Sequence, residues 1–208
     1  MKTCTNHCGR SSRKNATIMK LNKIICGDAA EELKKMPDKC VDFVLTDPMY
    51  DFGTETKTAL LAQFLRVSKN GAAVFYSPEN QWMTPSQTLF WIKPLSTKNT
   101  TRRYSRFVEM IGIYGNVKWN HRRHWSQYTN VFYDLVDGEK QHPFEKPTSL
   151  IKRLILNHSD VGDIILDPFM GSGTTAVVAK ILGRNFIGIE KNPVYCQIAA
   201  SQLSQYAP

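Results

Sequence analysis

At 208 residues, of which 42% are hydrophobic, the chain is long enough to fold as one globular domain with a sizeable core. No apolar stretch approaches the roughly 20 residues needed to cross a bilayer, which excludes a membrane-spanning protein and predicts no membrane partner. The five cysteines are odd in number and scattered, which indicates free thiols in a reducing, cytoplasmic compartment rather than the disulfides of a secreted protein.

The formal net charge of +9 is concentrated in two segments, of which the first is the N-terminus. Residues 1–17 are polar and basic, and we expect them to form a flexible tail in front of a single domain at 18–208. Cys4, His7 and Cys8 lie in this tail, but no second pair of ligands follows at zinc-finger spacing. We therefore predict no metal site.

The second basic segment, 93–123, carries eight Lys or Arg residues against one acid, Glu109, and aromatic residues are interleaved with them. Basic side chains mixed with aromatic rings suit phosphates and unstacked bases, which favours a nucleic-acid partner. A solvated basic face above core aromatic residues is the alternative interpretation.

Short apolar runs alternate with stretches of helical periodicity along most of the chain. Strands are expected at 22–26, 41–45, 72–76, 163–166 and 185–189, and helices at 29–36, 57–67, 147–156 and 176–182. This alternation predicts an α/β fold with a doubly wound, mostly parallel sheet.

A glycine-rich turn, Asp167-Pro168-Phe169-Met170-Gly171-Ser172-Gly173-Thr174-Thr175, follows the strand at 163–166 and opens a helix. Such a turn directs backbone N–H groups at a ligand, and glycine allows the ligand to come close. Glu190 ends the next strand, 17 residues after Gly173, where a carboxylate can accept hydrogen bonds from a ribose diol. The pattern predicts an adenosine-containing cofactor, and alone it fits NAD in an oxidoreductase as well as S-adenosylmethionine.

A second motif, Thr46-Asp47-Pro48-Met49-Tyr50, follows the strand at 41–45. A carboxylate, a carbonyl and an aromatic ring leave the strand together at its carboxyl end. Open α/β sheets bind their ligands at this edge, so the motif is a candidate catalytic site.

Three motifs together carry a resemblance to a known family. They are Thr46-Asp47-Pro48-Met49-Tyr50, then His142-Pro143-Phe144-Glu145-Lys146-Pro147, then the glycine-rich turn. In this order the chain resembles the amino-group (adenine-N6 or cytosine-N4) DNA methyltransferases, in the permuted beta-class arrangement with the catalytic motif before the cofactor motif. The resemblance implies the fold of the S-adenosylmethionine-dependent methyltransferases, S-adenosylmethionine as cofactor, double-stranded DNA as partner, and the cytoplasm of a bacterial or phage-infected cell. It also permits a homodimer.

The resemblance further implies roles for individual residues. Asp47 and the Pro48 carbonyl would each accept one N–H of the target amine, and Tyr50 would stack on the flipped base. The implied cofactor-binding residues are Asp28, His142, Lys146, Asp167, Phe169, Gly171, Gly173, Thr174 and Glu190. Lys146 would pair with the carboxylate at the methionine end of the cofactor. Asp28 has a simpler alternative, because it could serve only as the cap of the helix that begins at Ala29.

Residues 82–141 correspond to the target-recognition segment of the permuted arrangement. The predicted DNA contacts are Lys93, Arg102, Arg103, Arg106, Arg122 and Arg123. The Asp at the head of the catalytic motif favours adenine N6, with cytosine N4 as the alternative. An RNA substrate would account for the basic charge equally well.

Met49 departs from the family pattern, which usually has a second proline at this position. A proline there restricts the residue before it to an extended conformation, so Pro48 lacks that restraint in this chain. We expect activity to survive, since the Pro48 carbonyl is still present. The alternative is a non-catalytic, DNA-binding relative whose site Met49 has damaged.

Overall fold

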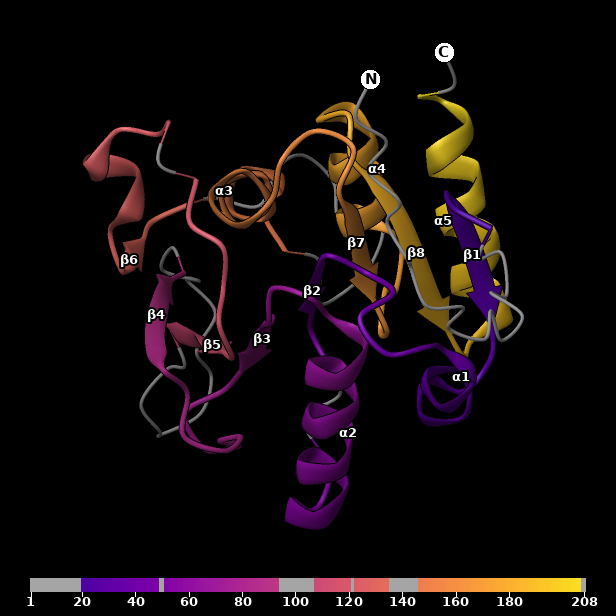
Figure 1. Ribbon diagram of the computed structural model, residues 1–208, viewed down its shortest axis with the longest axis horizontal. Helices are drawn as coiled ribbons and strands as arrows, with labels where there is room; N and C mark the ends of the chain where they lie inside the picture. Colours follow the sequence, from indigo (N-terminus) through magenta and orange to yellow (C-terminus); the bar gives the residue numbers. More distant parts are fainter. Residues whose placement is uncertain (1–19, 49–50, 94–106, 121, 135–145, 207–208) are drawn as a thin grey trace, which may run out of the picture.

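The computed structural model describes residues 20–48, 51–93, 107–120, 122–134 and 146–206. Within them, eight strands form one sheet in the order β1-β8-β7-β2-β3-β5-β4-β6 (Figure 1). The strands are β1 (Lys23–Cys26), β2 (Phe43–Thr46), β3 (Ala72–Tyr76), β4 (Gln87–Ile92), β5 (Val108–Tyr114), β6 (Val131–Phe132), β7 (Ile164–Asp167) and β8 (Asn185–Glu190). Only β5 runs antiparallel to its neighbours β3 and β4, and the other described strand pairs are parallel.

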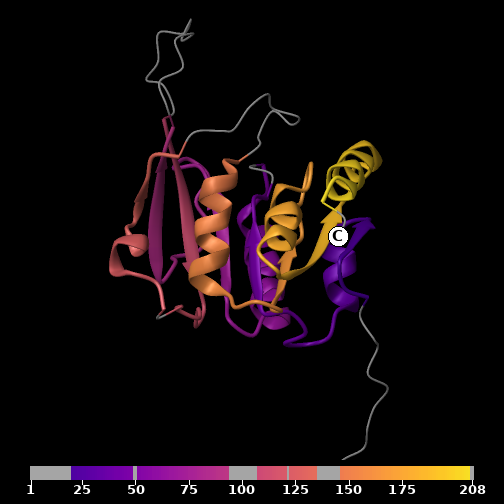
Figure 2. The same ribbon diagram turned by 90° about the horizontal axis from the view of Figure 1, so that it is seen from above.

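Helices cover both faces of this sheet. The helices α3 (Thr148–His158), α4 (Thr174–Ile181) and α5 (Pro193–Ser204) lie on one face, and α1 (Ala29–Lys35) and α2 (Thr54–Val67) lie on the other (Figure 1). Figure 2 shows the strands side by side with α3 and α4 packed in front of them. No helix among the described residues is long and apolar enough to cross a bilayer.

The hydrophobic core is divided by the sheet into two layers. Phe43 of β2 packs with Leu154 of α3 on one side, and its neighbour Val44 packs with Phe64 of α2 on the other. Successive residues of a strand point to opposite faces, so all four residues of β2 are buried. The predicted doubly wound, mostly parallel α/β fold is confirmed.

Every strand and helix expected from the sequence is present, with ends shifted by up to three residues. The described part of the segment 82–141 supplies three further strands, β4, β5 and β6, and the short 3-10 helix η1 (Trp125–Tyr128). Some aromatic residues of this segment belong to the core, because Trp91 is only 3% exposed, whereas Trp125 is 78% exposed. The segment is therefore partly built into the sheet.

The winding of the sheet reverses between β7 and β2. From β7 the chain passes through α4 to β8 on one side, and from β2 it passes through α2 to β3 on the other. β7 and β2 are parallel neighbours, with Leu166 opposite Val44, so their carboxyl ends lie side by side. Doubly wound sheets bind ligands at this switch point. The glycine-rich turn follows β7, and Asp47 follows β2.

Candidate active site

Two glycines shape the glycine-rich turn after β7. Gly171 has a φ of 53°, and its N–H donates to Glu190 Oε2 at 2.9 Å, which ties the turn to the end of β8. Gly173 has a φ of 96° and is the N-cap of α4. A Cβ at this position would lie 2.9 Å from the Cβ of Ala199 in α5, so a side chain is excluded by both conformation and space. α4 consequently begins with a cap that has no side chain.

Asp167 is a buried carboxylate at the base of the turn. Its Oδ1 accepts hydrogen bonds from Thr46 Oγ1 at 2.8 Å and from the N–H of Phe169 at 3.1 Å. Burial raises the pKa of Asp167 to about 6, against the effect of its hydrogen bonds from Thr175 and Thr46, and the nearby charge of Asp47 adds to the rise. Asp167 thus joins the turn to the end of β2, where the catalytic motif begins.

Glu190 and Asp28 mark the carboxyl ends of the next two strands. Glu190 Oε1 accepts from the N–H of Asn192 at 2.7 Å, in addition to the bond from Gly171. Asp28 is the N-cap of α1, since its Oδ1 accepts from the N–H of Ala30 at 3.0 Å, and its Oδ2 pairs with Lys191 at 3.2 Å. The capping interpretation of Asp28 is confirmed, and its contact with a cofactor stays a prediction.

Asp47 follows β2 and is held by Lys146, which is only 7% exposed. The Nζ atom of Lys146 lies 2.7 Å from Asp47 Oδ2 and 2.8 Å from Glu109 Oε2. Pro48, whose carbonyl is the second proposed acceptor, is buried beside Asp47. Lys146 bridges Asp47 and a second acid, because a buried ammonium requires anionic partners. Its expected contact with the methionine end of the cofactor stays a prediction.

Glu109, in β5, has a second cationic partner in Lys93, which pairs with its other oxygen, Oε1. Burial alone would raise the pKa of Glu109, but Lys146 and Lys93 outweigh it and hold this pKa below its usual value. Lys93, Glu109, Lys146 and Asp47 form a row of alternating charges, which we call the ion cluster. Lys93 pairs with Glu109 in the structure, and its predicted contact with DNA stays a prediction.

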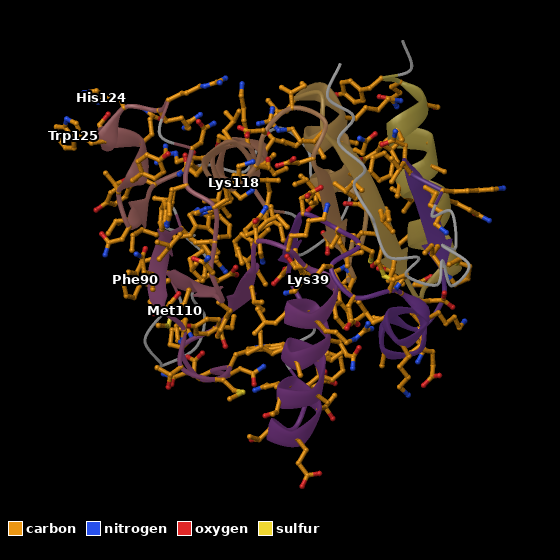
Figure 3. The ribbon with its side chains drawn as sticks, in the orientation of Figure 1. Lys39, Phe90, Met110, Lys118, His124 and Trp125 are labelled. Atoms are coloured by element: carbon orange, nitrogen blue, oxygen red, sulfur yellow. The ribbon has the colours of Figure 1, made fainter. Side chains whose placement is uncertain are left out.

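The remaining predicted DNA contacts are distributed unevenly. Arg122 and Arg123 precede η1 at the side of the sheet opposite Asp47, because their neighbour Lys118 pairs with Asp160 (2.7 Å) and Asp163, just before β7 begins. Figure 3 shows Lys118 near the end of α3, and His124 and Trp125 projecting outward from η1. The parallel strands begin at this side of the sheet and end at the side where Asp47 follows β2. Arg122 and Arg123 therefore lie at the end of the sheet away from Asp47, and their predicted contact with DNA stays a prediction.

An aromatic contact joins the loop after β2 to the glycine-rich turn. Phe52, in the loop after β2, packs against Phe169 of the glycine-rich turn, with ring centroids 5.7 Å apart. Phe169 therefore connects the glycine-rich turn to the loop that contains Phe52. Several predicted residues lie outside the described part of the chain: Met49, Tyr50, Arg102, Arg103, Arg106 and His142.

Two residues of the site were not singled out from the sequence. The sequence offered a reason to single out Glu109, since it is the only acid in the basic segment 93–123 and lies in an apolar run. Thr46 was part of the quoted motif without a role of its own. Their partners, Lys146 and Asp167, lie far away along the chain, so only the strand order brings them together.

Comparison with known proteins extends this picture. A family model described as DNA methylase, of the N6/N4 methyltransferase type, matches residues 64–201, which is more than half of the chain. DNA adenine methyltransferase YhdJ of Escherichia coli K12 is 29% identical, over 86% of this chain and 82% of its own length. The type II methyltransferase M.HinfI of Haemophilus influenzae is 25% identical, over 90% of this chain and 70% of its own length.

Solved structures agree with the family model. The crystal structure of the M1.HpyAVI–SAM complex superposes with a TM-score of 0.70 at 28% identity, covering 86% of this chain and 98% of that one. The cytosine-N4-specific PvuII DNA methyltransferase shares the fold, with a TM-score of 0.67 at 16% identity over 86% of this chain and 85% of its own. The resemblance carried by the three motifs is confirmed, and the chain belongs to the N6/N4 DNA methylase family.

Proposed function

We propose that this chain transfers the methyl group of S-adenosylmethionine to the exocyclic N6 amine of adenine in double-stranded DNA. The family provides the enzyme class, and the M1.HpyAVI–SAM complex supports S-adenosylmethionine as the cofactor. The observation that carries the proposal is the hydrogen bond of 2.8 Å from Thr46 to Asp167. Because of this bond, the residue before Asp47 directly contacts Asp167, the acid that opens the glycine-rich turn. The proposed methyl acceptor site at Asp47 and the proposed cofactor site at the turn are therefore adjacent.

The turn after β7 fits the cofactor. Gly171 and Gly173 provide a backbone turn without side chains, and Thr174 opens the helix behind it. Each oxygen of Glu190 accepts one backbone N–H, and a carboxylate has about four acceptor sites, which leaves capacity for ribose hydroxyls. When bound, S-adenosylmethionine supplies a methyl group made electrophilic by the sulfonium. We assign Asp28 to the neighbourhood of its adenine ring.

Asp47 and Pro48 make the target amine reactive in this proposal. The amine of adenine is a poor nucleophile, because its lone pair is delocalised into the ring. The Asp47 carboxylate and the Pro48 carbonyl each accept one N–H, which turns the lone pair toward the methyl group. The surplus proton leaves through Asp47 or a water beside it. Tyr50 stacks on the flipped base, and stacking worth about 1–3 kcal/mol offsets part of a flipping cost of a few kcal/mol.

Adenine is favoured by the Asp that heads the catalytic motif and by the relative YhdJ, which is named an adenine methyltransferase. Cytosine N4 is the second candidate, because the same two acceptors would serve its exocyclic amine and the cytosine-N4 enzyme PvuII shares the fold. The proposal places the enzyme in the cytoplasm of a bacterial or phage-infected cell, since the two relatives named above come from bacteria.

The proposal is tested by incubating the purified chain with methyl-labelled S-adenosylmethionine and unmethylated genomic DNA, then digesting the DNA to nucleosides. We expect label in N6-methyladenine. Label in N4-methylcytosine would replace the base and keep the mechanism. Absence of label with S-adenosylmethionine binding intact would contradict the proposal and favour the non-catalytic relative. An RNA substrate is tested in parallel with total RNA in place of DNA.

A further inference from the structure

We propose that Glu109 is a positioning residue for methyl transfer, which acts on Asp47 through Lys146. The inference rests on the proposed function, because it concerns how Asp47 is prepared to receive the target amine. The three sequence motifs give Glu109 no role, and the ion cluster of the structure does.

Contacts within the ion cluster are direct and alternate in sign. Lys146 Nζ lies 2.7 Å from Asp47 and 2.8 Å from Glu109, so one ammonium is shared between two carboxylates. Lys93 pairs with the second oxygen of Glu109. These contacts are close ion pairs, and Glu109 Oε2 accepts no hydrogen bond among the described residues, so charge attraction holds it to Lys146. The orientation of Asp47 is thereby linked to β5 and to the residue that follows β4.

The position of Glu109 is fixed by the sheet rather than by a loop. Glu109 lies opposite Trp91 in the antiparallel pair of β4 and β5, and both side chains are buried. The Nζ atom of Lys146 lies 5.3 Å from the ring centroid of Phe75, in β3, and 5.9 Å from that of Trp91. Cation–π contacts and two carboxylates together compensate the burial of this ammonium. The cluster thus rests on three adjacent strands.

The sharing of the Lys146 ammonium between Asp47 and Glu109 affects how strongly the Asp47 carboxylate accepts hydrogen bonds and protons. A lysine paired only with Asp47 would neutralise its carboxylate and compete with the target amine for its oxygens. Because Glu109 takes part of the interaction with Lys146, Asp47 remains a stronger hydrogen-bond acceptor and a stronger base. Glu109 therefore sets both the direction and the basicity of the catalytic carboxylate.

Charged groups from several elements bear on Asp47, and they decide the sign of the expected effects. Asp167, at the end of β7, is close enough for the two carboxylates to affect each other's ionisation. Lys146 precedes α3, Glu109 lies in β5 and Lys93 follows β4. Removing the negative charge of Glu109 favours ionised Asp47, and removing the positive charge of Lys146 disfavours it.

The test compares Glu109→Gln and Lys146→Gln with the wild type in the pH dependence of turnover. We expect kcat to fall by roughly 10- to 100-fold in both variants, since a misplacement of about 1 Å can cost about 100-fold. The acid limb of the kcat/KM profile should move to lower pH in Glu109→Gln and to higher pH in Lys146→Gln. A purely structural role would not shift the two variants in opposite directions.

Controls separate the proposal from a loss of fold and from failure of the proposed function. Asp38→Asn makes the same chemical change in an exposed carboxylate, paired with Arg66 at 2.7 Å, and should leave kcat and the profile unchanged. Glu109→Asp keeps the charge and should retain the wild-type acid limb. Thermal unfolding confirms that each variant is folded, and if Glu109→Gln is not, Lys146→Gln and Glu109→Asp decide the question.

The proposal is overturned if both variants shift the acid limb in the same direction, or if neither shifts it. It is also overturned if Lys146→Gln mainly weakens the binding of S-adenosylmethionine, because Lys146 would then serve the cofactor. A wild-type chain that transfers no label to DNA would instead refute the proposed function, and that result is seen before any variant is made.

Discussion

The carboxylate of Asp167 lies beneath the glycine-rich turn, where burial raises its pKa to about 6 from an ordinary value of 3.8. A carboxyl group with a raised pKa binds its proton more tightly in the folded state than in the unfolded state. Its contribution to stability is therefore fully present below the unfolded pKa and is lost as the pH rises through the folded pKa. Above pH 6 the folded protein holds an ionised carboxylate at a stability cost.

Asp167→Asn should remove this pH dependence, because an amide of the same shape does not ionise. The free energy of unfolding of the variant, relative to the wild type, should rise by roughly 2.5 kcal/mol between pH 4 and pH 8, since each pKa unit corresponds to about 1.36 kcal/mol and part of the change occurs below pH 4. Urea unfolding of both proteins across this range measures the difference. A difference that stays constant with pH would show that Asp167 is not the group responsible.

Asp28, the N-cap of α1, has two proposed roles, one in the helix and one at the cofactor. Asp28 caps the helix through bonds to the N–H groups of Ala30 and Glu31, and it also stands at the carboxyl end of β1, beside the proposed cofactor site. The amide of asparagine can accept the same capping bonds, but it carries no charge.

Asp28→Ala should lower the free energy of unfolding by about 1 kcal/mol, and Asp28→Asn should stay close to the wild type. If Asp28 also contacts the cofactor, both variants should bind S-adenosylmethionine more weakly. Chemical denaturation and calorimetric titration give the two quantities separately. Wild-type cofactor affinity in Asp28→Asn would leave Asp28 as a helix cap alone.

The elements that could be predicted from the sequence are those with strong local signals. β7 and the glycine-rich turn are examples, because an apolar run followed by glycines has few alternatives. β5 was not predicted, since its register places Glu109 inside an apolar strand, and a buried acid is understood only when its two lysine partners are known. The ion pairs of Lys146 could not be predicted either, because Asp47 follows β2 and Glu109 lies in β5, and only the strand order brings them together. The expected contact of Lys146 with the cofactor stays a prediction.

For the whole molecule, the carboxyl ends and the amino ends of the parallel strands form two opposite sides, which have different consequences for DNA binding. β4 ends and β5 begins at the side of the sheet where Asp47 follows β2, and Arg102, Arg103 and Arg106 lie outside the described residues, between these two strands in the sequence. Arg122 and Arg123 are anchored at the opposite side, where Asn120 bonds the end of α3. In the proposed function, a duplex that delivers a flipped base to Asp47 would approach the side of the sheet where β4 ends.

Neutralising Arg102, Arg103 and Arg106 together should weaken DNA binding and reduce the slope of log affinity against log salt by about 1 for each phosphate that the variant no longer neutralises. The double variant of Arg122 and Arg123 should change the slope much less and serves as the matched control. Fluorescence anisotropy at several salt concentrations measures both. Equal effects of the two sets would indicate that DNA wraps around both sides.

Asp47 acts on the target amine in the proposed reaction, while the glycine-rich turn beside it holds the cofactor. The most direct test of this division is to measure S-adenosylmethionine affinity and methyl transfer to DNA in Asp47→Ala alongside the wild type. We predict transfer reduced to background with cofactor affinity nearly unchanged, because the interaction that the variant removes is made with the amine and not with the cofactor. A large fall in cofactor affinity, or transfer at the wild-type rate, would contradict the assignment of Asp47.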